Sequence, residues 1–188
     1  MKRDFTKWGL LKVALTGATL GSLMDAFHTY GGATSYPDPV LLRAAWWTPI
    51  IFAIAYLSIA LVYVPVQWLF KSELPSGKQQ LFGVVFFAAL YFASGFLPFE
   101  NPAKVLVLIT GALVLFAFVD RSKAAITCGV AGAFIGPVTE IILTKLELFS
   151  HLQPDFMRIP MWLPALYFAS GPGLGGFLAQ LATKQPKA

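Results

Sequence analysis

Charged residues and cysteine are both scarce in this sequence. Only 12% of its 188 residues are charged, 57% are hydrophobic, and the mean hydropathy is +0.69. A chain of this length cannot hide so much apolar surface in a water-soluble fold, so lipid must be its main solvent. The single cysteine, Cys128, can form no internal disulfide and has no CxxC partner for a metal or redox role. We interpret it as a small packing residue.

Motifs of the common enzyme classes are also missing. The sequence has no HExxH, no Walker loop and no nucleophile elbow. Ser22, Asp25 and His28 resemble a hydrolase triad only superficially, because a straight helix separates Ser22 from His28 by about 9 Å along its axis. The glycine-rich segment 171–176 matches G-x-G-x-x-G, but no strand precedes it, and close helix packing explains it better. We predict no catalysis, no cofactor and no metal site.

Six long apolar runs occupy most of the chain. A helix needs about 20 apolar residues to span the hydrocarbon of a bilayer. The runs do not alternate as the strands of a barrel would, and within lipid a helix satisfies its own backbone. The sequence therefore predicts an all-α polytopic membrane protein, with residues 1–188 forming a single domain of six transmembrane helices. The predicted spans are residues 8–27, 46–70, 81–97, 103–119, 124–143 and 159–181.

The basic residues lie beside the ends of these spans rather than in one patch, so the net charge of +5 does not indicate nucleic-acid binding. Lysine and arginine are enriched on the cytoplasmic side of membrane proteins. Placing the N-terminus inside leaves only Arg43, Lys104, Lys145 and Arg158 outside, and it predicts that both termini are cytoplasmic. The basic residues inside are then Lys2, Arg3, Lys7, Lys71, Lys78, Arg121, Lys123, Lys184 and Lys187.

With Lys104 counted as flanking its span, few ionisable residues fall inside the predicted helices: Lys12, Asp25, His28 and Glu140. A charge in hydrocarbon is costly, so such residues normally face the bundle interior or water. Lys12 lies near the cytoplasmic end, where its side chain can reach the headgroups. Asp25 and His28 share one face of the first helix. They either hydrogen-bond each other as a self-contained polar patch or bind the headgroup of an amphiphile.

Glu140 has no charged neighbour in its own span. It must be protonated, solvated or matched by a group on another helix. We interpret His151, in the last loop, as a solvated residue. Asp25, His28 and Glu140, together with the Gly-Pro breaks in the spans, leave a second function open, that of a small proton-coupled secondary transporter.

Several short motifs follow one another along almost the whole chain. In this order and spacing they resemble those of the insulin-induced-gene (Insig) family of endoplasmic-reticulum membrane proteins. The motifs are Tyr36-Pro37-Asp38, Ala45-Trp46-Trp47-x-Pro49, Ala93-Ser94, Val119-Asp120-Arg121-Ser122, Pro154-Asp155-Phe156, Trp162-Leu163-Pro164 and Ser170-Gly171.

This resemblance implies a six-helix protein with both termini in the cytosol, in agreement with the charge count. Insig proteins bind oxysterols between their helices, retain the sterol-sensing escort protein Scap in the endoplasmic reticulum, and present the sterol-synthesis reductase for degradation. Asp120 matches the aspartate that the family uses in partner binding. The alternative is that Asp120, Arg121 and Ser122 simply cap helix ends and lie in water.

Three departures from the family pattern point away from the animal members. The long polar N-terminal segment is missing, Val119 replaces a phenylalanine, and Tyr91-Phe92 replaces a polar pair. The chain thus looks more like a minimal bacterial homologue, with a glycerolipid or another apolar amphiphile as ligand and the bacterial cell membrane as its location. A eukaryotic member would lie in the endoplasmic-reticulum membrane.

We therefore predict a non-enzymatic lipid-binding membrane protein, a sensor or regulator that holds a sterol- or diacylglycerol-like amphiphile in a central cavity. Another membrane protein or a second copy of the chain is a further expected partner. The predicted lipid-binding residues are Asp25, His28, Tyr91, Ser94 and Glu140, and the predicted partner-binding residue is Asp120.

Overall fold

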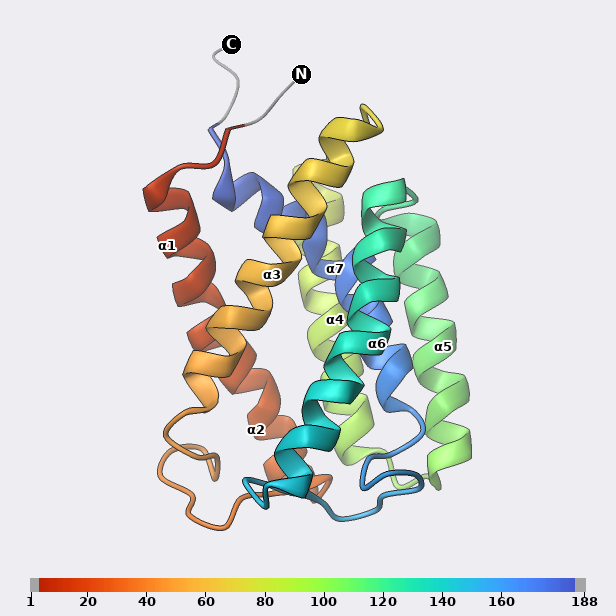
Figure 1. The fold of residues 1–188 in the computed structure, drawn as a ribbon. Coiled ribbons are helices and arrows are strands. Elements are labelled where there is room, and N and C mark those ends of the chain that lie inside the picture. The colour runs from red at the N-terminus through yellow and green to blue at the C-terminus, as the bar shows by residue number, and fades with distance from the viewer. Residues whose placement is uncertain (1–3, 185–188) are drawn as a thin grey trace.

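The structure, a computed structural model, describes residues 4–184 and is mostly helical, as predicted. The first predicted span is one long helix in three parts, with a single π-helical turn (η1) between α1 and α2 (Figure 1). The parts are α1 (Lys7–Thr16), η1 (Gly17–Gly21) and α2 (Ser22–Gly31). The other helices are α3 (Thr48–Leu69), α4 (Gly77–Phe96), α5 (Asn101–Phe118), α6 (Lys123–Lys145) and α7 (Leu163–Ala182).

Within residues 4–184, five helices are long and apolar enough to cross a membrane: Lys7–Gly31, Thr48–Leu69, Gly77–Phe96, Asn101–Phe118 and Lys123–Lys145. The sixth predicted run forms α7, which has the same length as α4 but more glycine and proline. Most residues of α7 are buried, whereas at most a third of each of the five other windows is. Because protein rather than lipid surrounds α7, small residues serve it better than large apolar ones.

α7 lies at the centre of the bundle and packs against α1, α3, α4, α5 and α6 (Figure 1). Its glycines allow this close approach. A Cβ atom at Gly171 would overlap the carbonyl oxygen of Ala125 and the backbone of Gly129, both on α6. On the opposite side, a Cβ atom at Gly83 of α4 would lie 2.6 Å from the carbonyl oxygen of Gly173. The glycine-rich segment is therefore a packing surface for two helices.

Both ends of the described chain lie at the same end of the bundle, which we call the termini end (Figure 1). The backbone nitrogen of Thr6 donates to the carbonyl oxygen of Ala182 over 3.1 Å, and that of Lys184 donates to Asp4 over 3.1 Å. These bonds fix the start of α1 against the end of α7. Lys2, Arg3 and Lys187, which the orientation prediction also uses, lie outside the described residues.

The two longest loops meet at the opposite end, which we call the loop end. Each contributes a two-residue strand, β1 (Thr34–Ser35) and β2 (Ser150–His151), and the strands pair antiparallel with Thr34 opposite His151. The Tyr36 ring stacks on Phe149 with ring centroids 5.6 Å apart. These strands were not predicted from the sequence. They join the first and last loops into one cap over the helix ends.

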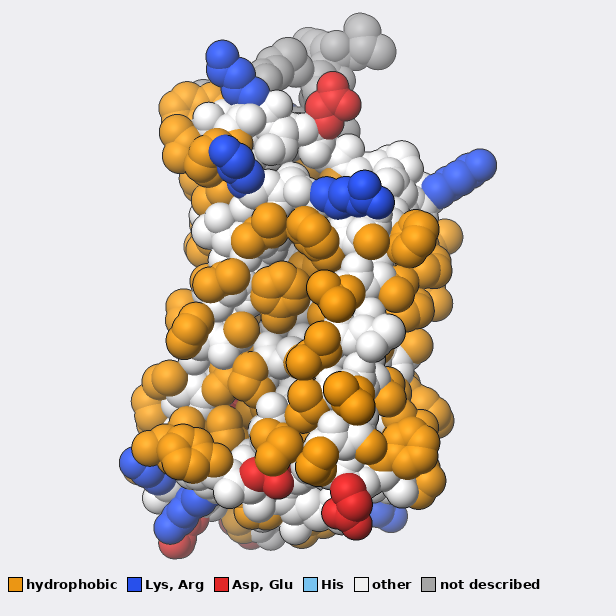
Figure 2. Space-filling model, turned by 90° about the vertical axis from the view of Figure 1, so that its right-hand side faces the viewer, with side chains coloured by type: hydrophobic (Ala, Val, Ile, Leu, Met, Phe, Trp, Pro, Cys, Tyr) orange, Lys and Arg blue, Asp and Glu red, His pale blue; other side chains and the backbone are white. Residues whose placement is uncertain are grey.

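The outer surface carries a broad apolar band between two charged ends. In Figure 2, apolar side chains cover the middle of one face, lysine and arginine gather toward the termini end, and acidic and basic residues lie together at the loop end. Large side chains within the band are strongly exposed, for example Leu106 at 69% and Phe134 at 70%. Such a band is the surface expected of a protein whose helices face hydrocarbon.

Candidate functional site

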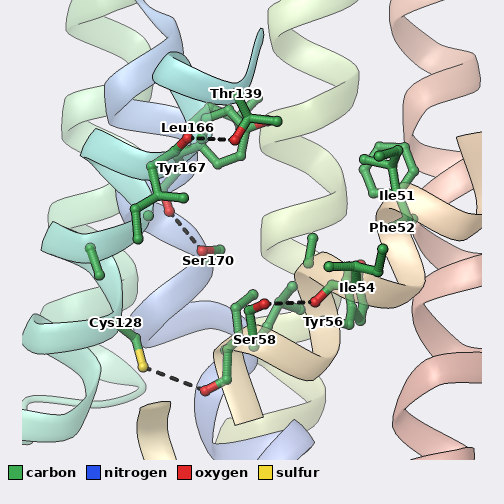
Figure 3. Close-up of a pocket in the computed structure, with 18 of the residues that line it drawn as sticks. Ile51, Phe52, Ile54, Tyr56, Ser58, Cys128, Thr139, Leu166, Tyr167 and Ser170 are labelled. Atoms are coloured by element: carbon green, nitrogen blue, oxygen red, sulfur yellow. Dashed lines mark hydrogen bonds between the residues drawn. The ribbon is translucent and has the colours of Figure 1, made fainter. Parts of the chain in front are cut away.

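A cavity of about 240 Å³ lies between α3 and α6, with α7 and α4 behind it (Figure 3). Apolar side chains form most of its wall, among them Ile51, Ile59, Leu166 and Leu174. Ile54 and Ile135 line the cavity and are also 55% and 66% exposed at the outer surface. The cavity is therefore open on one side, between α3 and α6, toward the surface that faces lipid.

Small residues create this space. Ala55 on α3 and Ala131, Gly132 and Gly136 on α6 contribute no bulk at the level of the cavity. The ring of Tyr167 packs so closely on Gly136 that a Cβ atom there would overlap it. The π-helical turn also contributes, because it brings Gly21 to the wall, where a Cβ atom would lie 2.6 Å from Cβ of Phe52. The cavity thus depends on the position of glycine and alanine as much as on any large side chain.

The serine and threonine hydroxyls of the cavity wall donate their hydrogens to backbone carbonyls of their own helices. Ser58 donates to Ile54 over 2.8 Å, Thr139 to Ile135 over 2.8 Å, and Ser170 to Tyr167 over 2.7 Å (Figure 3). Their hydroxyl oxygens keep free lone pairs. The wall therefore offers hydrogen-bond acceptors, and it suits an apolar molecule that carries a hydroxyl donor.

Tyr91 is the one predicted lipid-binding residue in the cavity wall. Its ring stacks on His28 with centroids 4.7 Å apart, and His28 Nε2 lies 2.7 Å from Ser94 Oγ. Ser94 Oγ donates to the carbonyl oxygen of Tyr91 over 2.8 Å, so it accepts from His28, and Nε2 carries the hydrogen. The structure brings Tyr91, His28 and Ser94 together, with His28 and Ser94 behind the wall on the side of the loop end.

Asp25 and His28 do not bond each other, so the interpretation of a self-contained patch is wrong. Asp25 instead accepts a hydrogen bond from Tyr36 over 2.9 Å. Tyr36 lies in the first loop, where burial, followed by the nearby Asp25 charge, raises the pKa of its hydroxyl above the ordinary value. Tyr36 therefore remains a neutral donor, and a loop residue satisfies the embedded acid.

Glu140 is hydrogen-bonded by residues of α7 and of the last loop. Its Oε1 accepts from the Tyr167 hydroxyl of α7 over 2.6 Å, and its Oε2 lies 2.6 Å from His151 Nε2. The interpretation of His151 as a solvated residue is wrong, because it is 7% exposed and bound to this acid. Tyr167 lines the cavity, whereas Glu140 does not. Glu140 therefore acts on the cavity through the ring that it orients.

Sequence reasoning missed Tyr36, His151 and Tyr167, although each binds a predicted site residue. Tyr36 lies in the Tyr36-Pro37-Asp38 motif, which is the one signal that could have identified it. Nothing in the spacing of His151 or Tyr167 marks either residue, because the two loops and α7 meet Asp25 and Glu140 only in the folded bundle.

Asp120 lies at the termini end in the turn between α5 and α6, and it is 5% exposed. It accepts hydrogen bonds from the Tyr63 hydroxyl of α3 and, over 2.9 Å, from the backbone nitrogen of Ser122. Ser122 Oγ caps α6 by accepting from the backbone nitrogen of Ala125 over 3.1 Å. The alternative interpretation is thus right about the Ser122 cap and wrong about water, since Asp120 is buried.

We expect Tyr63→Phe to destabilise the termini end, because Asp120 would remain buried with one donor fewer. A lost bond to a buried charged acceptor costs about 1–3 kcal/mol. Thermal unfolding in detergent should show a lower midpoint than the parent. Tyr30→Phe is the matched control, since Tyr30 is 52% exposed and its ring contact with Arg43 survives the change. Equal midpoints for the two variants would contradict the assignment.

No family model matches the chain. It is 27% identical over 183 residues to the insulin-induced gene 1 protein of Gallus gallus, covering 92% of this chain and 71% of that protein. It is 26% identical to the Homo sapiens protein of the same name over 181 residues, covering 91% of this chain and 64% of the human one.

The fold is similar to that of MvINS, a mycobacterial Insig homolog from Mycobacterium vanbaalenii. The TM-score is 0.86 at 22% identity, over 98% of this chain and 100% of that one. A cross-linked MvINS trimer gives the same TM-score at 21% identity. The similarity in sequence and fold agrees with the Insig-like motifs along the chain. The chain is similar to the Insig proteins in sequence over most of its length and in fold, and it is an integral membrane protein with transmembrane helices.

Proposed function

We propose that this protein is a non-enzymatic lipid-binding protein that crosses the membrane six times, with both termini in the cytoplasm and residues 1–188 forming one domain. The shared position of the two ends supports an even number of crossings. Lysine and arginine near the termini end support its cytoplasmic location (Figure 2). α7 completes the count as the central helix. The bacterial cell membrane remains our expected location.

The ligand that fits best is an amphiphile with a hydroxyl donor, such as a diacylglycerol or a sterol. The one observation that carries this proposal is the cavity, apolar over most of its wall, lined by hydroxyl acceptors and open toward lipid. The hydroxyl group of the ligand would donate to Ser58, Thr139 or Ser170. Its apolar part would extend through the opening between α3 and α6 into the lipid, so the bound ligand need not fit entirely within the cavity.

The predicted site residues take different parts in this proposal. Tyr91 contacts the ligand from the cavity wall. Glu140 positions Tyr167, which forms part of the same wall. His28 and Ser94 support the back of Tyr91. Asp25 holds the first loop through Tyr36 and has no contact with the cavity.

We further propose that the lipid-bound protein acts as a sensor or regulator through contact with another membrane protein or with further copies of itself. The Insig resemblance supports the first partner, and the trimer formed by MvINS supports the second. Asp120 would act by shaping the turn between α5 and α6, because its buried carboxylate is already engaged by Tyr63 and Ser122.

We expect Ala131→Phe to weaken lipid binding by at least about tenfold, which corresponds to about 1.4 kcal/mol. Ala131 lines the cavity, so a phenyl ring there would occupy the space of the ligand. Native mass spectrometry of the protein in detergent, titrated with 1-palmitoyl-2-oleoylglycerol, measures the affinity. Ala133→Phe is the matched control, since Ala133 is half-buried on the same helix and does not line the cavity.

An equal loss in both variants, or none in either, would count against the cavity as the binding site.

A proteoliposome experiment separates a binding protein from a transporter. We expect no flux of the same lipid in response to a pH gradient, because a binding protein without alternating access carries nothing across.

A further inference from the structure

A second lipid site, separate from the cavity, is suggested by the surroundings of Lys104 at the start of α5. Lys104 is 7% exposed, and its Nζ donates to the carbonyl oxygen of Ser94 over 3.0 Å. An ammonium has three hydrogens to donate. Among the described residues no carboxylate lies within 4 Å of it, because the one ion pair found there joins His151 and Glu140. Within residues 4–184, Lys104 is therefore a buried cation with no carboxylate in ion-pair contact.

Lys104 lines a polar pocket of about 390 Å³ at the loop end. The pocket lies between the ends of α2 and α4, the start of α5 and the last loop, and its wall includes Gly32, Asn101 and Trp162. Both amide hydrogens of Asn101 are engaged, since Nδ2 donates to Gln153 and Asp155, and its Oδ1 accepts from Trp162 Nε1 over 3.0 Å. Among the buried polar side chains of this pocket, the free donor capacity therefore belongs to Lys104.

An apolar groove leads along the outside of the bundle to this pocket. It runs between α2 and α4, and Leu23, Phe27, Ala88 and Phe92 line it. Phe96 lines both the groove and the polar pocket, and Tyr30 of the groove directly precedes Gly31 of the pocket. Groove and pocket thus form one continuous surface, apolar over the helices and polar at the loop end.

We propose that this surface binds a phospholipid, with one acyl chain in the groove and the headgroup phosphate on Lys104. The phosphate would supply the counter-ion that the protein does not, through a charge-assisted hydrogen bond. The groove runs along the helices and the pocket lies at their ends, which matches the order of chain and headgroup in a leaflet. Free phosphate would satisfy Lys104 as well, but it would leave the groove unused.

The other charged residues near the pocket indicate which phospholipid headgroup would fit it. Glu100 also lines the pocket and is exposed, so its carboxylate faces the open side. Asp155 is occupied by Asn101 Nδ2 and by the backbone nitrogen of Met161, each over 2.8 Å. His28 lies behind Ser94, bound to its hydroxyl. A cation inside and an anion at the rim suit a zwitterionic headgroup, with phosphate on Lys104 and the ammonium of phosphoethanolamine beside Glu100.

Native mass spectrometry of the full chain in detergent tests this proposal. The probes are palmitoyl-oleoyl phosphatidylethanolamine, 1-palmitoyl-2-oleoylglycerol with the same chains and no phosphate, and inorganic phosphate. We expect one phosphatidylethanolamine to bind in addition to a saturating amount of the diglyceride, because the two sites are separate. If phosphatidylethanolamine and the diglyceride displaced each other, the proposal of a second site would be wrong. The proposed lipid binding in the cavity would still stand.

Lys104→Met should lower the affinity for phosphatidylethanolamine by at least about tenfold, the scale of one charged hydrogen bond. Lys104→Arg should restore most of it. Lys145→Met is the matched control, as Lys145 is an exposed lysine at the same end. Binding of the diglyceride should be unchanged in all three, which also shows that each variant is folded. An equal loss in Lys145→Met would reveal attraction by surface charge alone and would overturn the proposal.

Two further variants test separate points. One distinguishes a lipid phosphate from free phosphate, and the other tests the contact with the headgroup ammonium. Ala88→Phe fills the groove and leaves Lys104 in place, so it should weaken phosphatidylethanolamine and not inorganic phosphate. If inorganic phosphate alone binds and Ala88→Phe has no effect on the lipid, the site is one for a free anion and the lipid proposal fails. Glu100→Gln should reduce the preference for phosphatidylethanolamine over phosphatidylglycerol. An unchanged preference would overturn the ammonium contact.

Discussion

Replacing Gly171 with leucine is expected to prevent stable assembly of the bundle. A Cβ atom at this position would overlap backbone atoms of Ala125 and Gly129 on α6. Backbone cannot rotate aside as a side chain can, so α6 and α7 would have to separate along their contact. We expect a loss of more than about 4 kcal/mol, at the upper end for a single substitution. Size-exclusion chromatography and thermal unfolding in detergent measure the result.

Gly77→Leu is the matched control for this change. Gly77 begins α4, and a Cβ atom there would have no neighbour within 4 Å. We expect an unfolding midpoint close to that of the parent. Gly171→Ala should fall between the two, since it adds the clashing atom without the rest of the side chain. A monodisperse Gly171→Leu protein with the midpoint of the parent would show that α6 and α7 are not held in this contact.

The second large effect is expected from Glu140→Leu. The change would leave the Tyr167 hydroxyl and His151 Nε2 without their acceptor, and both side chains are largely buried. Deleting one member of a buried network costs about 3 kcal/mol. His151 belongs to β2, which pairs with β1, so the loss should extend to the cap at the loop end. We expect a lower unfolding midpoint and weaker binding of 1-palmitoyl-2-oleoylglycerol.

Limited trypsin digestion provides a local readout of the same change. Arg158 lies in the loop that carries β2, and its Nη1 donates to the carbonyl oxygen of Thr144 over 3.0 Å. Cleavage after Arg158 should become faster in Glu140→Leu, because the loop loses its anchor. Glu147→Leu removes an exposed acid from the same loop region and should leave the rate unchanged. Equal rates in the two variants would argue against His151 and Glu140 as the anchor of the cap.

The membrane character of this protein could be predicted from the sequence because it depends on composition alone. In a chain of this length, long apolar runs with few charges are expected to form membrane-spanning helices. The run predicted at 46–70 corresponds to Thr48–Leu69, and that at 124–143 to Lys123–Lys145. Helix ends differ from the predicted ones by a few residues because caps such as Ser76 of α4 and Ser122 of α6, rather than hydropathy, decide where those helices begin.

The contacts of the site could not be predicted in the same way. Asp25 and His28 share a helix face, which suggested that they bond each other, yet each finds its partner on another segment. Two-residue strands such as β1 and β2 are too short to leave a periodic pattern. The cavity is equally invisible in sequence, because it arises where α3 and α6 carry alanine and glycine at the same level of the bundle.

The central place of α7 also has a consequence for biosynthesis. α7 follows α1 to α6 in the chain, so it leaves the ribosome after every helix that it contacts. The earlier helices can enter the bilayer one by one, since each satisfies its own backbone. Their glycine-rich faces, however, have no permanent neighbour until the final helix arrives. We therefore expect the bundle to mature only after α7 has inserted, and the bundle without α7 to be the form most open to proteolysis.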